Sequence, residues 1–143
     1  MADVIVGIGG GGQTPGTPNT YSPIAALNFP PGTPVAASIT VAGEVQLAGA
    51  FGGNFSCPTG IAVTTGVAGH HVLIQYAGPI SLTTAEWDAI LVSGSGGFSP
   101  GIFYYLSDVE GEFGRLTTTA PSNPATVVAP VGIALSPTDF LVR

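Results

Sequence analysis

The stretch that decides the fold is SPGIFYYLSDVEGEFGRLTTTAPSNPATVVAPVGIALSP, residues 99–137. It contains short runs of β-branched and aromatic residues, such as IFYYLS and ATVVAPVGIALS, separated by glycine, proline and serine. Runs of this kind, bounded by turn residues, are typical of β-strands joined by tight turns. The pattern extends upstream to Pro31, where PVAASITVAGEVQLAG predicts a hairpin that turns at Ala42 and Gly43. We therefore expect an all-β fold, a small barrel or sandwich of about ten short antiparallel strands.

One segment departs from this pattern and predicts a short helix. In SLTTAEWDAILVSG, Thr83 precedes Glu86 at the spacing of a capping box. Trp87, Ile90 and Leu91 then follow at helical spacing. We expect a helix near residues 84–91, with Trp87 closing one end of the core.

Three pairs of similar segments, in the same order, indicate an internal repeat. PPGTPV (30–35) resembles SPGIFY (99–104), AGEVQLA (42–48) resembles FGRLTTT (113–119), and TGIAV (59–63) resembles VGIAL (131–135). We expect two related β-units, residues 31–82 and 99–143, on either side of the helix. Because 22 of the 143 residues are glycine and 13 are proline, chance similarity is the alternative.

The charge content is far below that of ordinary soluble domains. Charged residues make up 7% of the chain, against about 25% in typical domains. Arg115 and Arg143 are the two basic residues, and the net charge is −6. Phosphate binding needs clustered Lys and Arg, so nucleic acid is not an expected partner. No apolar run reaches the roughly 18 residues of a membrane span. A surface this poor in charge predicts coverage by partner subunits, with a secreted or heat-stable monomer as the alternative.

Residues 1–30 have a different texture and are expected to form an extended arm before the domain of residues 31–143. The run DVIVGI precedes four glycines and a Pro-rich segment, which is unsuited to a self-contained fold. We expect the arm to add a strand to a neighbouring subunit and to lie across its surface. A disordered tail is the alternative. The candidate partner-binding residues are the large apolar ones: Val4, Ile5, Val6, Ile8, Tyr21, Ile24, Leu27 and Phe29.

Candidates for chemistry are few. His70 and His71 are adjacent, so on a strand they point to opposite faces and do not readily share a metal. Cys57 has no basic neighbour in sequence to activate its thiol. The segment SDVEGEFG gathers the acids Asp108, Glu110 and Glu112 in one turn, which suits a solvated tip or at most a weak Ca²⁺ site. We expect no catalytic residues, no cofactor and no required metal, and hence no enzyme.

Residues 30–143 carry a resemblance to a known class of proteins. The segment from Gly97 to Arg143, with Pro-Gly before Tyr-Tyr-Leu-Ser and a later Val-Gly-x-Ala-Leu-Ser, resembles a C-terminal module of tailed-bacteriophage virion proteins. The upstream PPGTPV, VQLA and TGIA pieces are similar to small head-decoration and capsid-stabilising proteins. Tyr104 and Tyr105 alternate along a strand, so one is expected to face the core and the other a partner or solvent, a scaffold role that agrees with the resemblance.

Two functions follow as expectations from this resemblance. The first is a non-enzymatic virion protein that decorates or cements a capsid, made in the host cytoplasm, with the major capsid protein or copies of itself as partners in a homo-oligomer. The second is a tail or fibre module that binds a host-surface glycan or another tail protein. The shortness of the chain favours the first.

Overall fold

A computed structural model describes residues 19–50, 58–109, 112–121 and 130–143. Ten strands and one helix form within these ranges: β1 (Asn19–Tyr21), β2 (Ile24–Ala25), β3 (Pro34–Ala37), β4 (Glu44–Leu47), β5 (Pro58–Ala62), β6 (Ile74–Ser81), α1 (Thr84–Asp88), β7 (Phe103–Leu106), β8 (Leu116–Thr117), β9 (Pro130–Ala134) and β10 (Asp139–Val142). The all-β class with a short helix is thereby confirmed.

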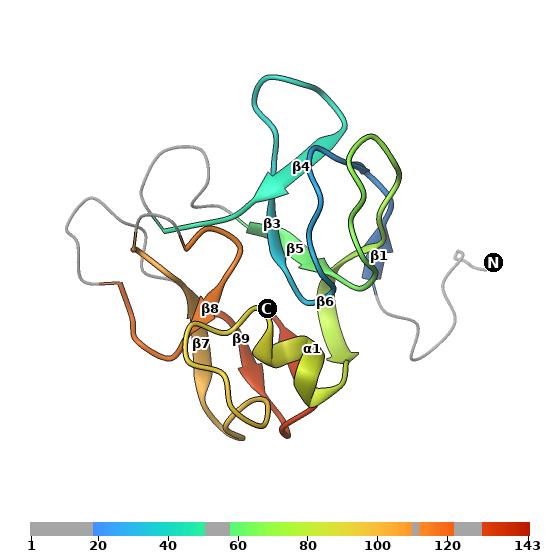
Figure 1. Ribbon diagram of the computed structural model, residues 1–143. Helices are drawn as coiled ribbons and strands as arrows, with labels where there is room; N and C mark the ends of the chain where they lie inside the picture. Colours follow the sequence, from blue (N-terminus) through green and yellow to red (C-terminus); the bar gives the residue numbers. More distant parts are fainter. Residues whose placement is uncertain (1–18, 51–57, 110–111, 122–129) are drawn as a thin grey trace.

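The strands form one sheet in the order β2-β4-β3-β5-β6-β10-β9-β7-β8, and β1 also pairs with β6. The path is open, so the ten strands do not close into a single barrel. All pairings are antiparallel except that of β2 with β4. In Figure 1 the strands β1, β3, β4 and β5 lie in the upper part of the view, and β7, β8 and β9 lie below them.

Strand β6 belongs to both parts of the sheet. Its beginning pairs with β5 and β1, whereas Gly78–Ser81 pair with β10. We refer to β3, β4, β5 and β6 as the first half and to β7, β8, β9 and β10 as the second half. The strand orders of the two halves correspond, β4-β3-β5-β6 in one and β8-β7-β9-β10 in the other.

The hairpin of β3 and β4 forms where the sequence predicts it. Val35 pairs with Leu47 and Ala37 with Val45 across the two strands. Gly43 has a φ of +84°, a left-handed conformation that glycine adopts without steric cost. Glycine is therefore favoured at this turn over residues that carry a Cβ.

Helix α1 ends at Asp88, three residues before the end of the predicted helix at residues 84–91. The predicted capping box is present: the Thr83 side chain accepts from the Glu86 N–H, and the Glu86 carboxylate accepts from the Thr83 N–H. Two reciprocal bonds thus satisfy donors that the first helical turn leaves free.

The interior contains two clusters of buried side chains. The larger surrounds Trp87, which is 0% exposed, and includes Phe98 and Phe140, whose rings lie 4.4 and 5.8 Å from the Trp87 ring. The indole N–H of Trp87 donates to the Thr138 carbonyl at 2.7 Å, so the polar edge of the ring is also paired. The smaller cluster lies within the first half, around Val35, Val45 and Ile74.

The structure corrects the expected boundary between arm and domain. Residues 19–21 form β1 and pair with β6, and residues 24–25 form β2 and pair with β4. Phe29 is 4% exposed and packs in the smaller cluster. Residues 19–30 therefore belong to the domain, because proline and glycine interrupt them without preventing short strands from pairing with a sheet already present.

Candidate interaction surface

The expected arm residues fall into two groups. Tyr21, Ile24, Leu27 and Phe29 contact the chain's own sheet, and the Tyr21 hydroxyl donates to the Thr59 hydroxyl at 2.8 Å. Tyr21, Ile24 and Leu27 are partly buried within the chain and Phe29 is buried, and their expected contact with a partner stays a prediction. Val4, Ile5, Val6 and Ile8 lie outside the described residues.

A row of apolar side chains crosses four neighbouring strands on the exposed side of the second half. Phe103 pairs with Ile133, Ile133 pairs with Leu141, and Leu141 pairs with Pro79. Residues paired directly across antiparallel strands place their side chains on the same face of a sheet. Phe103 is 39% exposed and Pro79 is exposed, while Ile133 and Leu141 are half-buried. We call this side of β6, β10, β9 and β7 the outer face.

Further apolar groups adjoin the outer face. Ile102, which precedes Phe103, is 41% exposed, and Tyr105 on the same strand is half-exposed. The guanidinium carbon of Arg143 lies 5.5 Å from the centre of the Phe103 ring, within cation–π range. Tyr104 points the other way and is 4% exposed, as the predicted alternation of Tyr104 and Tyr105 requires.

The outer face is the feature that sequence reasoning missed. The sequence contained a signal for it, because IFYYL and FLV are apolar at consecutive positions rather than at alternate ones. A strand exposed on one side usually alternates between apolar and polar residues, whereas a strand covered on both sides does not. The second half thus has the composition of a sheet covered on both faces.

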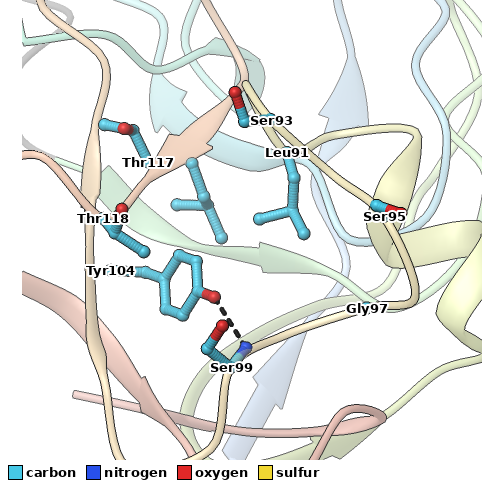
Figure 2. Close-up of a pocket in the computed structure, with 9 residues that line it drawn as sticks. Leu91, Ser93, Ser95, Gly97, Ser99, Tyr104, Thr117 and Thr118 are labelled. Atoms are coloured by element: carbon cyan, nitrogen blue, oxygen red, sulfur yellow. Dashed lines mark hydrogen bonds between the residues drawn. The ribbon is translucent and has the colours of Figure 1, made fainter.

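A small pocket of about 200 Å³ opens beside β7 and β8. Figure 2 shows Tyr104 directed across it, with its hydroxyl accepting the Ser99 N–H at 2.9 Å. The lining is hydroxyl-rich and uncharged, with residues Leu91, Ser93, Ser95, Gly97, Ser99, Tyr104, Leu116, Thr117 and Thr118. Such a lining can hydrogen-bond a neutral polar ligand.

The candidate metal residues do not come together in the part of the chain that is described. No three His, Cys, Asp or Glu side chains there are arranged to hold a metal ion. His70 and His71 are exposed, and Nδ1 of His71 lies 2.7 Å from the Ser22 carbonyl oxygen. The Ser107 hydroxyl donates to the Glu112 carboxylate. Cys57 and Glu110 lie outside the described ranges. Over those same ranges, no helix has the length and hydropathy needed to cross a membrane.

The Asp139 side chain links the two halves, because it accepts a hydrogen bond from the Ser81 hydroxyl across the β6–β10 pair. A hydrogen bond from the Ser81 hydroxyl, supported by those of Thr138 and Ser136, holds the pKa of Asp139 below its ordinary value, although burial opposes the shift. A carboxylate with a depressed pKa in the folded state stabilises the fold above the pKa it has in the unfolded chain. This contribution is lost as the pH falls through the lower pKa of the folded state.

We expect Asp139→Asn to lower the stability at pH 7 and to have a progressively smaller effect as the pH falls below about 4, the ordinary pKa of Asp. The measurement is urea unfolding of both proteins between pH 7 and pH 2.5. The Ser81→Ala variant, which removes the main donor, should also weaken the acid dependence. A stability difference that stays constant over this pH range would contradict the expectation.

Comparison with known proteins adds no relative to this description: no protein family, no curated protein and no solved structure matches the chain.

Proposed function

We propose that this chain is a non-enzymatic structural protein of a bacteriophage virion, which decorates or cements the capsid lattice through subunit contacts. The observation that carries the proposal is the outer face, where Phe103, Ile133, Leu141 and Pro79 form a continuous apolar row. A contiguous exposed apolar patch on a soluble protein typically marks a site of contact with another macromolecule.

The charge content supports contacts of this apolar kind. With two basic and eight acidic residues in 143, the chain has few groups with which to form ion pairs to a partner. Contacts therefore rest on apolar burial and backbone hydrogen bonds, which added salt does not screen. The partners that we propose are the major capsid protein and further copies of this chain, at the capsid surface. Val4, Ile5, Val6 and Ile8 are proposed to add contacts to the capsid.

A tail or fibre module that binds a host glycan, or another tail protein, is the second candidate. The hydroxyl-lined pocket beside Tyr104 favours it, because hydroxyl groups can hydrogen-bond a sugar (Figure 2). The Tyr104 ring is 4% exposed, however, so the pocket does not present an aromatic surface on which a sugar ring could stack. The outer face is the larger apolar feature, and we place the capsid role first.

The test is co-sedimentation of the purified chain with capsids assembled without it, followed by electron cryo-microscopy of the loaded particles. We expect the chain to sediment with the capsids and to remain bound at about 0.5 M salt, where charges are screened beyond a few ångströms. A truncation that lacks residues 2–12 should bind at lower occupancy. Full recovery of the chain in the supernatant, or its release by salt, would refute the proposal, and retention on a glycan array would favour the second candidate.

A further inference from the structure

The two halves match each other residue by residue, beyond their common strand order. In each half the register shifts at one place, between Val35 and Ala36 in the β3–β5 pair and between Tyr104 and Tyr105 in the β7–β9 pair. Three backbone hydrogen bonds of the first half have an equivalent in the second half. In the first half they are Gly32 N–H to Ala62 O, Ala62 N–H to Thr33 O, and Val63 N–H to Leu73 O. In the second half, in the same order, they are Gly101 N–H to Ala134 O, Ala134 N–H to Ile102 O, and Leu135 N–H to Asp139 O. These pairs define which residue of one half corresponds to which residue of the other.

The interior residues obey the same correspondence. The inward side chains of the first half and their counterparts in the second are Val35 and Tyr104, Val45 and Leu116, Ala62 and Ala134, and Ile74 and Phe140. A segment next to the hairpin also recurs, because Ala25 bridges to Val45 and Leu91 bridges to Leu116. The residue that corresponds to Ile24 is therefore Ile90.

Within one chain the two halves contact each other through surfaces that do not correspond to one another. Ala36 and Ile61, on the side of the first half that faces away from its own cluster, are 0% exposed and pack in the cluster of the second half. A Cβ added to Gly32 would lie 3.0 Å from the Trp87 ring, and the Gly114 N–H donates to the Ala48 carbonyl at 2.7 Å. One surface of the first half is thus covered by a different surface of the second half.

The matching surface of the second half is the outer face, which stays partly exposed, with the Arg143 guanidinium over its Phe103 ring. Thr33 is 1% exposed, whereas its counterpart Ile102 is 41% exposed. Ile61 is fully buried, whereas its counterpart Ile133 is half-exposed. A Cβ at Gly101, the counterpart of Gly32, would meet no atom within 4 Å.

The first half also has an exposed counterpart to the surface with which the second half contacts it. Ile90, Leu106 and Val142, which are 2–5% exposed in the cluster shared by the two halves, correspond to Ile24, Ala37 and Tyr76. Ile24 is half-exposed, Ala37 is exposed and Tyr76 is 47% exposed, with the Tyr21 ring 6.1 Å away. We call the surface formed by Tyr21, Ile24, Ala37 and Tyr76 the front face.

We propose that the front face of one copy of this chain binds the outer face of a second copy, so that the side-chain packing between the two halves is repeated between molecules. The β6–β10 strand pairing is not repeated, because β1 already pairs with the matching edge of β6. The proposal rests on the proposed function in one respect, since both take the outer face as a subunit contact. It adds the identity of the partner, which is a second copy of the chain. Side-chain volumes are compatible with this second contact. Within the chain, Ala36 of the first half packs in the same cluster as Leu106 of the second half. Between chains their counterparts are Tyr105 and Ala37, so a small side chain is again combined with a large one. The hydrogen bond from Ala50 N–H to Ser107 O does not recur, because Pro121 stands at the position matching Ala50 and has no N–H.

A contact between two different surfaces has a geometric consequence. Each bound molecule still offers one free face of each kind, so association continues head to tail until a ring closes or a chain grows. A two-fold dimer in which one patch meets its own copy is not the expected product.

The test uses the purified full-length chain without capsids, in light scattering coupled to size exclusion and in analytical ultracentrifugation. We expect the wild type to have a mass of two or more times the monomer mass of 14.2 kDa. Phe103→Ser on the outer face and Tyr76→Ser on the front face should each raise the dissociation constant by about ten-fold or more. Val67→Ser is the control, because Val67 is equally exposed, at 47%, and belongs to neither face.

Mixing the two face variants gives the decisive result. The Phe103→Ser protein retains an intact front face and the Tyr76→Ser protein retains an intact outer face, so an equimolar mixture should form a mixed dimer that neither protein forms alone. A wild type that remains monomeric up to millimolar concentration, or a mixture that does not associate, would overturn the proposal. Because capsids are absent, failure here leaves capsid binding to be decided by co-sedimentation, and failure of co-sedimentation does not affect the mass measurement.

Discussion

Replacement of Trp87 by alanine is expected to lower the free energy of unfolding by about 3–5 kcal/mol. The Trp87 side chain is fully buried, packs against Phe98 and Phe140, and lies where the two halves meet, next to Gly32. Its removal leaves a cavity and takes away one of the two hydrogen bonds that the Thr138 carbonyl accepts, the other coming from the Leu82 N–H. Since small domains have total stabilities of about 5–15 kcal/mol, the variant should be close to unfolding.

Chemical denaturation monitored by far-ultraviolet circular dichroism measures this loss. Trp87→Phe is the matched control, because it retains an aromatic ring and loses the indole hydrogen bond and part of the volume. We expect an intermediate loss, about half that of alanine. If Trp87→Ala unfolded at the wild-type denaturant concentration, the described packing at the junction would be wrong.

Replacement of Gly132 by alanine is expected to cost about 3 kcal/mol, at the upper end of typical overpacking penalties. A Cβ at this position would lie 2.3 Å from the Leu141 carbonyl oxygen and 2.6 Å from the Phe140 ring. The carbonyl belongs to the neighbouring strand β10, so relief of the overlap requires two strands to separate. The loss is measured by urea unfolding.

Gly43→Ala is the control for Gly132→Ala. Gly43 has a left-handed φ of +84° but has no atom within 4 Å of an added Cβ. Alanine there should cost about 1–2 kcal/mol, the strain of a left-handed backbone. An effect of Gly132→Ala no larger than that of Gly43→Ala would show that the approach of β9 and β10 at Gly132 is looser than described.

The features that sequence could predict are those governed by neighbouring residues. The capping box of Thr83 and Glu86, the turn at Gly43 and the alternation of Tyr104 and Tyr105 depend on local backbone preference and side-chain period. The predicted helix extends three residues beyond the observed end at Asp88, because Ile90 and Leu91 have helical spacing but pack in the larger cluster, and Leu91 bridges to Leu116. Local pattern does not distinguish these two uses of an apolar residue.

The features that sequence could not predict depend on distant residues. The strands β1 and β2 contain three and two residues, too few for any periodic signal, and exist because β6 and β4 offer free edges to them. The apolar residues of segment 19–30 therefore suggested an external partner when their partner was partly the chain itself. The apolar runs of single strands do not specify the outer face, because its four members come from four strands whose order in the sheet brings them side by side.

The sharing of β6 between the two parts of the sheet has a consequence for biosynthesis. Residues 74–77 pair with strands that leave the ribosome before them, so the first half has its partners as soon as β6 emerges. Gly78–Ser81 must wait for β10, and Asp139 follows its partner Ser81 by 58 residues. Until then the nascent chain displays unpaired backbone groups, a template for any complementary strand nearby.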